Sequence, residues 1–89
     1  MISKEIKIIN KLGLHARAAM KLIDLASKFQ SHIDICYAGK IADAKDILNV
    51  MTLGASVGAT IALQIDGVDE EKAMQALCDL INDRFHEQE

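Results

Sequence analysis

The sequence has 89 residues, a length that fits one domain with a single hydrophobic core. Hydrophobic residues make up 51% and charged residues 26% of the chain, which is typical of a soluble globular fold and excludes a disordered one. The net charge of -3 disfavours nucleic-acid binding through phosphate contacts. No apolar run is long enough for membrane insertion and no signal-peptide pattern is present, so we expect a cytoplasmic domain.

A strand and a helix are the first expected elements. Residues 2–9 place Ile2, Ile6 and Ile8 at one parity and Glu5 and Lys7 at the other, which predicts a half-buried strand. Residues 10–13 break this pattern. Residues 16–29 then show apolar side chains at helical spacing, with charged side chains on the opposite face, so we expect a helix there.

A hairpin and a short helix are expected next. Residues 33–37 alternate in polarity as a second strand, and Ala38-Gly39 predicts a tight turn into a weaker third strand over residues 40–43. Such a turn makes the two strands antiparallel. Residues 47–53 are expected to form a short helix that begins after Asp46, an N-cap residue type, and ends before a glycine.

The last expected elements are a strand over residues 61–65, ended by Gly67, and a helix capped by Asp69. The tail at residues 86–89 is polar and is expected to fray. The apolar positions of the last helix form its predicted buried stripe: Ala73, Leu77, Leu80 and Ile81.

The resulting order, β-α-β-β-α-β-α, predicts a single α+β domain over residues 1–89. Because alternate residues of each of the four strands are apolar, one face of the sheet is apolar and needs helices packed against it. The architecture expected from the pattern is therefore a layered sandwich of one sheet and its helices.

The cysteines and two of the histidines carry no functional signal. Cys36 and Cys78 lie far apart and form no CxxC or Cys/His cluster, so we expect buried reduced thiols, no metal and no cofactor. His32 and His86 have no chemistry-bearing neighbours and are predicted to lie at the surface.

The candidate functional residues lie in the stretch of residues 11–20. Gly13 precedes His15, and Arg17 follows two positions later, where the strand-like pattern gives way to the helical one. His15 is therefore expected at or beside a helix N-terminus, where the first amides lack intrahelical partners and the dipole favours anions. Because an imidazole is largely uncharged at neutral pH, a ring nitrogen there could accept a phosphoryl group.

In this interpretation His15 is the phosphoryl acceptor and Arg17 its charge partner. The backbone amides of Ala16, Arg17 and Ala18 would bind the phosphoryl oxygens. The spacing alone is also compatible with a histidine that caps the helix or lies in solvent, and with a solvated arginine. Anion sites at helix ends are common and mostly non-covalent.

Two segments resemble a known family. Gly13-Leu-His-Ala-Arg-Ala-Ala19 is similar to the active-site segment of the HPr family, the histidine phosphocarriers of the bacterial phosphoenolpyruvate:sugar phosphotransferase system. Residues 44–54 resemble the second signature region of that family, and the order of elements agrees from about Ile2 to Phe85. Residues 10–17 and the following Ala-Met-Lys-Leu look closer to the nitrogen-related branch, often called NPr.

The resemblance implies a fold, a role and partners. The fold is an open-faced β-sandwich, a four-stranded antiparallel sheet with three helices on one face. His15 would take phosphate on Nδ1 from enzyme I and pass it to an EIIA-type protein, in sugar transport or nitrogen regulation, and Arg17 matches the family's arginine. The protein would be a monomeric, stoichiometric phosphocarrier rather than a turnover enzyme.

The resemblance also implies a partner-docking surface on the first and the short helix, formed by apolar residues with a charged rim. Either Ile47 or Met51 could instead belong to the core. The residues implied are Met20, Ile47, Leu48 and Met51.

Two positions depart from the family pattern. Ala18 stands where the family usually has proline; it restores an amide donor near the phosphoryl site, and we expect transfer to survive. Asp46 stands where many members carry a regulatory serine. It is interpreted as a helix cap, or alternatively as a permanent imitation of phosphoserine that weakens docking to enzyme I.

Two other function classes are alternatives. The runner-up is a non-catalytic regulatory module that docks on partners and whose phosphorylation state serves as a signal. A small sandwich that binds metal or RNA is disfavoured, because the sequence lacks CxxC motifs, stacking aromatic residues and a basic stripe.

Overall fold

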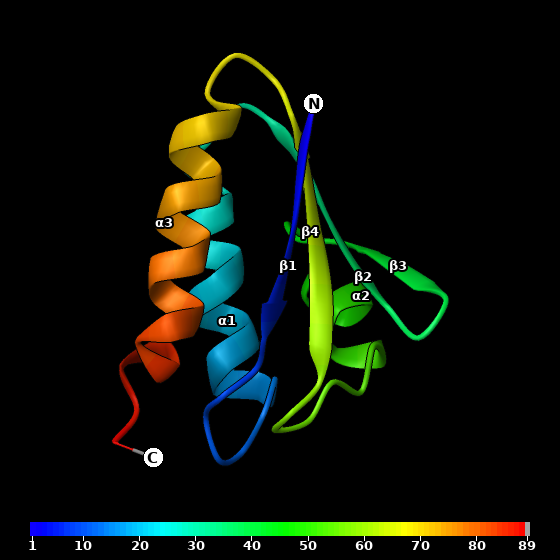
Figure 1. Cartoon of the computed structure of the whole chain (residues 1–89), viewed down its shortest axis with the longest axis vertical. Coiled ribbons are helices and arrows are strands. Elements are labelled where there is room, and N and C mark those ends of the chain that lie inside the picture. The colour runs from blue at the N-terminus through cyan, green and yellow to red at the C-terminus, as the bar shows by residue number, and fades with distance from the viewer. Residues whose placement is uncertain (89) are drawn as a thin grey trace.

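Four strands form one antiparallel sheet in the computed structural model, which describes residues 1–88 (Figure 1). The sheet order is β1-β4-β2-β3, so β4 lies between β1 and β2 and pairs antiparallel with both. The N-terminal strand thus pairs with the last strand of the chain. The four strands are β1 (Ile2–Lys7), β2 (His32–Tyr37), β3 (Lys40–Asp43) and β4 (Thr60–Asp66).

Within residues 1–88, three helices follow the predicted order, α1 (Ala16–Ala26), α2 (Ile47–Thr52) and α3 (Glu70–Asn82), and a short turn, η1 (Arg84–His86), comes after them. Helices α1 and α3 lie side by side next to the sheet (Figure 1). The prediction that the first helix reaches Phe29 is wrong. The α-helix ends at Ala26 because the chain then forms tighter, 3₁₀-type turns. The amides of residues 28 and 29 donate to the carbonyls three residues earlier, at 3.1 Å each.

The core lies between one face of the sheet and the helices. Alternate residues of β2 and β4 are buried, as the polarity pattern predicts, whereas the edge strands β1 and β3 each bury a single residue, Ile6 and Ala42. The predicted stripe of α3 is buried in full. Fully buried aliphatic residues from both layers meet in this core: Leu22, Ile33, Ile35, Ile61, Leu63, Ile65, Leu77 and Ile81.

The cysteines and surface histidines only partly follow expectation. Cys78 is buried, but Cys36 is half-buried, because it lies at the strand parity that faces away from the helices. Burial raises the pKa of both thiols. His32 and His86 are exposed, as predicted. Among the described residues, no helix is long and apolar enough to cross a membrane, and no three potential ligands cluster as a metal site.

Asp69 occupies the N-cap position of α3, but its side chain does not cap the helix as predicted. Its carboxylate accepts hydrogen bonds from the amides of Gln30 (2.9 Å) and Ser31 (3.0 Å) and from the Ser31 hydroxyl. These contacts tie the start of α3 to the segment that leads into β2. The Ser31 hydroxyl, followed by the Gln30 amide, holds the pKa of Asp69 below its ordinary value.

We expect the variant Asp69→Asn to lower the thermal midpoint by several degrees at pH 7. A carboxylate whose pKa is lowered by folding stabilises the native state above its unfolded pKa, and this contribution is lost as pH falls through the lowered value. The deficit of the variant should therefore shrink in acid. Thermal unfolding at neutral pH and near pH 3, with Glu71→Gln as the control on the same helix, measures this; a deficit independent of pH would contradict it.

Candidate functional site

The turn between β1 and α1 is held against the loop that precedes β4. Gly13 adopts a left-handed conformation with φ of +67°, and a Cβ at this position would lie 2.7 Å from Ser56 Cα and 2.9 Å from Ala55 O. The next amide, of Leu14, donates to Ala55 O at 2.9 Å. Only glycine satisfies both the backbone angle and the close approach.

Asn10 closes this turn from the inside. Its side chain is fully buried, and Nδ2 donates to Gly13 O at 2.7 Å and to Glu87 Oε1 at 3.1 Å. Asn10 Oδ1 has no hydrogen-bond partner among the described residues. Asn10 therefore connects the turn directly to the C-terminal tail, 77 positions away in the sequence.

His15 is the N-cap residue of α1, as predicted, and its side chain is 27% exposed. The ring makes no capping hydrogen bond, so the capping alternative is not the arrangement found. The amide of Ala19 is the first to bond within the helix, to His15 O at 2.8 Å. The amides of residues 16–18 precede that bond, so the first turn presents donors beside the imidazole.

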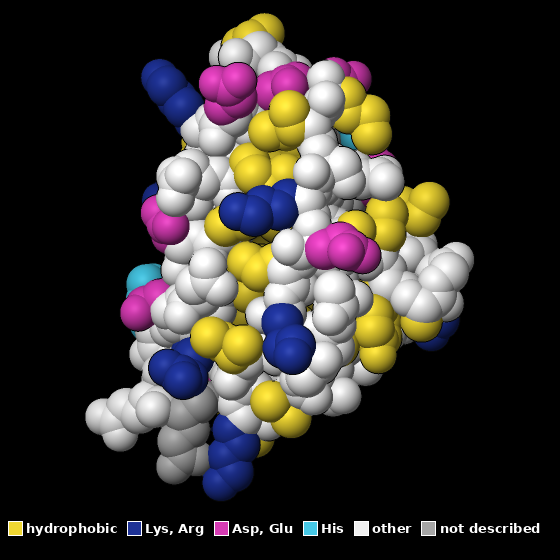
Figure 2. Space-filling view, viewed as in Figure 1, with side chains coloured by type: hydrophobic (Ala, Val, Ile, Leu, Met, Phe, Trp, Pro, Cys, Tyr) yellow, Lys and Arg dark blue, Asp and Glu magenta, His cyan; other side chains and the backbone are white. Residues whose placement is uncertain are grey.

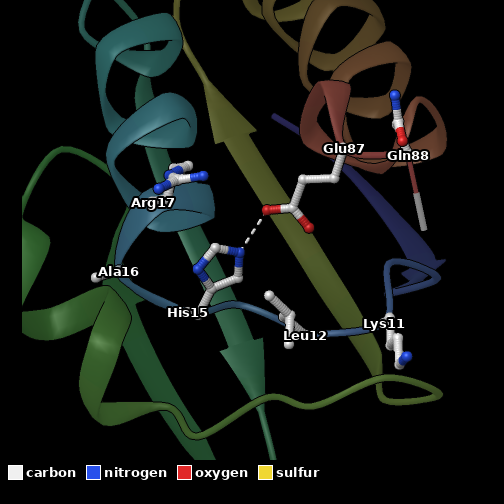
Figure 3. A pocket seen from close by; sticks show the side chains of 7 residues that line it. All are labelled: Lys11, Leu12, His15, Ala16, Arg17, Glu87 and Gln88. Atoms are coloured by element: carbon white, nitrogen blue, oxygen red, sulfur yellow. Dashed lines mark hydrogen bonds and ion pairs between the residues drawn. The ribbon is translucent and has the colours of Figure 1, made fainter.

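The imidazole contacts a residue that the sequence did not suggest. Glu87 Oε2 pairs with His15 Nε2, while Oε1 accepts from Asn10 (Figure 3). Burial raises the pKa of Glu87, but the hydrogen bonds from His15 and Asn10 outweigh it, and the net pKa lies below the ordinary glutamate value. Glu87 is therefore a carboxylate at neutral pH.

A cavity of about 610 Å³ opens beside this pair (Figure 3). Two of its lining residues, Lys11 and Arg17, are cationic, which suits an anionic ligand. Lysine and arginine side chains gather at the end of the molecule that carries the β1–α1 turn, and acidic ones at the end where α3 begins (Figure 2). The lining residues are Lys11, Leu12, His15, Ala16, Arg17, Glu87 and Gln88.

The tail reaches the site through an unusual turn. Arg84, Phe85 and His86 all have positive φ, of 55°, 53° and 63°, and fold the chain back after α3. Phe85 is fully buried, and its carbonyl accepts from Lys21 Nζ at 2.6 Å. No glycine or asparagine marks this turn in the sequence. The apolar Phe85 in a polar tail was the available signal; fraying of residues 86–89 stays a prediction, and Glu89 lies outside the described residues.

The predicted docking residues fall into two groups. Met20, Leu48 and Met51 are 58%, 73% and 42% exposed and form what we call the apolar face, on α1 and α2, which pack together. Ile47 is half-buried against the core, so it is the member of the Ile47/Met51 pair that contributes to packing.

The two positions that depart from the family pattern have clear structural roles. Asp46 caps α2, because its Oδ1 accepts from the amides of Leu48 (3.1 Å) and Asn49 (3.3 Å), as the cap interpretation predicts. Ala18 is fully buried in the first turn of α1. Neither residue lies in the cavity beside His15.

Comparison with known proteins gives one consistent family. Residues 2–83 match the family described as "PTS HPr component phosphorylation site". The chain is 49% identical to the phosphocarrier protein HPr of Cupriavidus necator over the whole of both chains, and 42% identical to the phosphocarrier protein NPr of Shewanella violacea, covering 97% of this chain and 94% of that one. A crystal structure of HPr from Thermoanaerobacter tengcongensis superposes with a TM-score of 0.96 at 44% identity over all of both chains.

The match covers nearly the whole chain, and the fold and the histidine at the start of α1 agree with it. The chain therefore belongs to the HPr family of the phosphotransferase system and is a phosphocarrier that transfers phosphate from enzyme I to an EIIA protein.

Proposed function

We propose that His15 is the residue that carries the phosphoryl group, through its Nδ1 atom. The supporting observation is the position of the ring: it caps no amide, is partly exposed, and borders a cavity with two cationic lining residues at the N-terminus of α1. A helix N-terminus favours an anion through its unpaired amides and its dipole. These are the requirements of a histidine that must hold a phosphoryl group and then release it.

In the proposed site, Arg17 and the first-turn amides bind the phosphoryl oxygens. The Arg17 side chain lies on the exposed part of the first turn and lines the cavity together with His15. A guanidinium can bind two phosphoryl oxygens at once while remaining charged at every physiological pH. The amides of Ala16 and Arg17, which line the cavity, supply uncharged donors, whereas Ala18 is fully buried outside it. These donors bind the group without holding it as tightly as a metal ion would.

The test of this function is incubation with enzyme I and phosphoenolpyruvate, followed by intact mass measurement. One phosphoryl adduct that is lost in acid and kept in alkali is the expected result, because a phosphorylated ring nitrogen leaves readily once the ring is protonated. Subsequent loss of the adduct on addition of an EIIA protein distinguishes a carrier from a regulatory module that only signals its phosphorylation state. An acid-stable adduct would contradict the assignment to histidine.

We also propose that the apolar face of Met20, Leu48 and Met51 docks both partners. Exposed apolar side chains next to charged ones suit interfaces that form and dissociate in each transfer cycle. Met51→Ser is expected to raise the KM of enzyme I for this protein by about tenfold, the loss of one contact of roughly 1.4 kcal/mol. The thermal midpoint should stay unchanged, since Met51 is exposed.

Steady-state phosphorylation at varied protein concentration measures this effect. Val68→Ser is the matched control, because Val68 is also exposed and apolar but precedes α3, away from the apolar face. Equal KM values for the two variants would place the docking surface elsewhere.

We also propose which branch of the HPr family the protein belongs to. The segment of residues 10–17 supports the nitrogen-related branch, whereas relatives named HPr reach 49% identity and the NPr reaches 42%. Transfer from the labelled protein to EIIA domains of both branches decides it, with faster transfer to the nitrogen-related acceptor expected. We further propose that the protein is cytoplasmic and monomeric. Light scattering on the purified protein measures the molar mass and so tests the monomeric state.

A further inference from the structure

We propose that Glu87 is a positioning residue for His15: its carboxylate holds the imidazole in the tautomer that carries its proton on Nε2, so that Nδ1 presents a lone pair to the incoming phosphoryl group. This inference rests on the proposed function of His15 as the acceptor. It adds a residue from the C-terminal tail to a site whose other members lie between residues 11 and 18.

The hydrogen-bonding capacity of the two partners determines the tautomer of the ring. An ionised carboxylate can only accept hydrogen bonds, so the nitrogen that pairs with Glu87 Oε2 must be the donor. A neutral imidazole carries a single proton. If that proton is on Nε2, the other nitrogen is unprotonated and nucleophilic. Glu87 thereby selects which of the two ring nitrogens reacts.

The orientation of the ring agrees with this assignment. Figure 3 shows the Nε2 side of His15 turned toward Glu87, while the other nitrogen points back toward α1 and Arg17. The unprotonated nitrogen thus lies on the side where the first-turn amides and the guanidinium would bind phosphoryl oxygens. A flipped ring would direct the nucleophile toward a carboxylate instead.

The carboxylate is itself held in place. Its second oxygen accepts from Nδ2 of the fully buried Asn10, which also bonds Gly13 O at 2.7 Å in the turn before His15. Each carboxylate oxygen therefore has a separate donor, one in the ring and one in the turn. An amide in place of the carboxylate has only one acceptor oxygen and could not serve both donors in the same way.

The turn that leads to Glu87 has an energetic cost. Three consecutive residues with positive φ precede Glu87, and none of them is glycine. Left-handed backbone costs an L-residue roughly 1–2 kcal/mol, and such strain persists only where surrounding contacts impose it. Here the buried Phe85 and the bond from Lys21 Nζ to its carbonyl impose it. The turn therefore places Glu87 beside the imidazole ring of His15.

The proton need not move during transfer. The Nδ1 lone pair forms the bond to phosphorus while the bond between phosphorus and the donor breaks, its electrons leaving with the donor. The phosphorylated ring then carries one positive charge, with the Nε2 proton facing the Glu87 carboxylate. On discharge the Nδ1–P electrons return to Nδ1 and the neutral ring is restored. Glu87 thus stabilises the charge that develops on the ring.

The experiment combines ring NMR with transfer kinetics. In parent protein labelled with ¹⁵N on histidine, at a pH where the ring is neutral, we expect the His15 Nε2 to carry the proton and Nδ1 to be bare. In Glu87→Gln the two tautomers should mix. The rate of phosphoryl transfer from enzyme I should fall at least tenfold with little change in KM, since partners that orient a reactive imidazole typically contribute about 10–100-fold. Glu5→Gln, with the same charge change on the exposed side of β1, is the control.

The possible failures are distinguishable. If the parent is phosphorylated at His15 but its free ring carries the proton on Nδ1, the role of Glu87 is refuted and the proposed function stands. The same holds if Glu87→Gln accepts phosphate as fast as the parent, or faster, as a tail that blocks the site would predict. If the parent accepts no phosphate at His15, the proposed function itself fails. The tautomer measurement on the parent requires no variant to fold.

Discussion

Replacement of His15 by glutamine is expected to abolish phosphoryl uptake from enzyme I. Glutamine has a polar side chain of similar reach but no nucleophilic nitrogen, since the amide lone pair is delocalised. Loss of a covalent nucleophile lowers rates by about 10⁴-fold or more in enzymes where it has been removed. The fold should persist, because the imidazole makes no capping hydrogen bond and is not part of the core.

Intact mass after incubation with enzyme I and phosphoenolpyruvate measures the loss. His32→Gln is the matched control, because His32 is an exposed histidine on β2 whose ring also pairs with a carboxylate, that of Asp34 at 3.0 Å. The control should be phosphorylated as fast as the parent. An adduct that survives in His15→Gln would assign the phosphoryl group to another residue and end the proposal.

The second large effect is expected on stability, from the variant Gly13→Ala. A left-handed φ of +67° costs an alanine roughly 1–2 kcal/mol. The added methyl group would also lie 2.7 Å and 2.9 Å from backbone atoms of Ser56 and Ala55, which cannot rotate away as a side chain can. Overpacking of this kind costs about 1–3 kcal/mol. The total, about 2–5 kcal/mol, is a large part of the stability of a small domain.

Gly39→Ala separates the two contributions. Gly39 has a similar φ of +80°, but a Cβ there would have no atom within 4 Å. The free energy of unfolding of Gly39→Ala should therefore fall only by the cost of a left-handed alanine backbone. Urea unfolding gives the free energy of unfolding of both variants, and equal losses would show that the approach to Ser56 contributes nothing. Gly13→Ala should also transfer phosphate more slowly, because displacement of the turn moves His15.

The sheet and helices could be predicted because each depends on local pattern. The alternating aliphatic residues of β4 and the 3.6-residue apolar stripe of α3 show which side of each element is apolar, and burial follows from that. The Ala38-Gly39 turn could be predicted because Gly39 readily adopts the positive φ that a tight hairpin requires, and Ala38 adopts it too. His15 was found because a helix start and a reactive side chain coincide in one short segment.

The contacts that sequence reasoning missed join distant segments. Asp69 was expected to cap its own helix, but its carboxylate bonds Ser31, which the fold brings alongside. Glu87 reaches His15 across 72 positions, through a turn whose residues have no special preference for positive φ. Contacts between such distant residues depend on the three-dimensional fold, so the residue pattern within a single segment cannot predict them.

The pairing of β1 with β4 has a consequence for the protein during its synthesis. His15 is synthesised before the loop that fixes its turn and before the strand that pairs with β1, which ends at Asp66. The carboxylate that contacts the ring is made later still. A nascent or truncated chain that stops before these segments therefore contains the histidine without the geometry around it, and enzyme I meets the complete site only after β4 and Glu87 have been made.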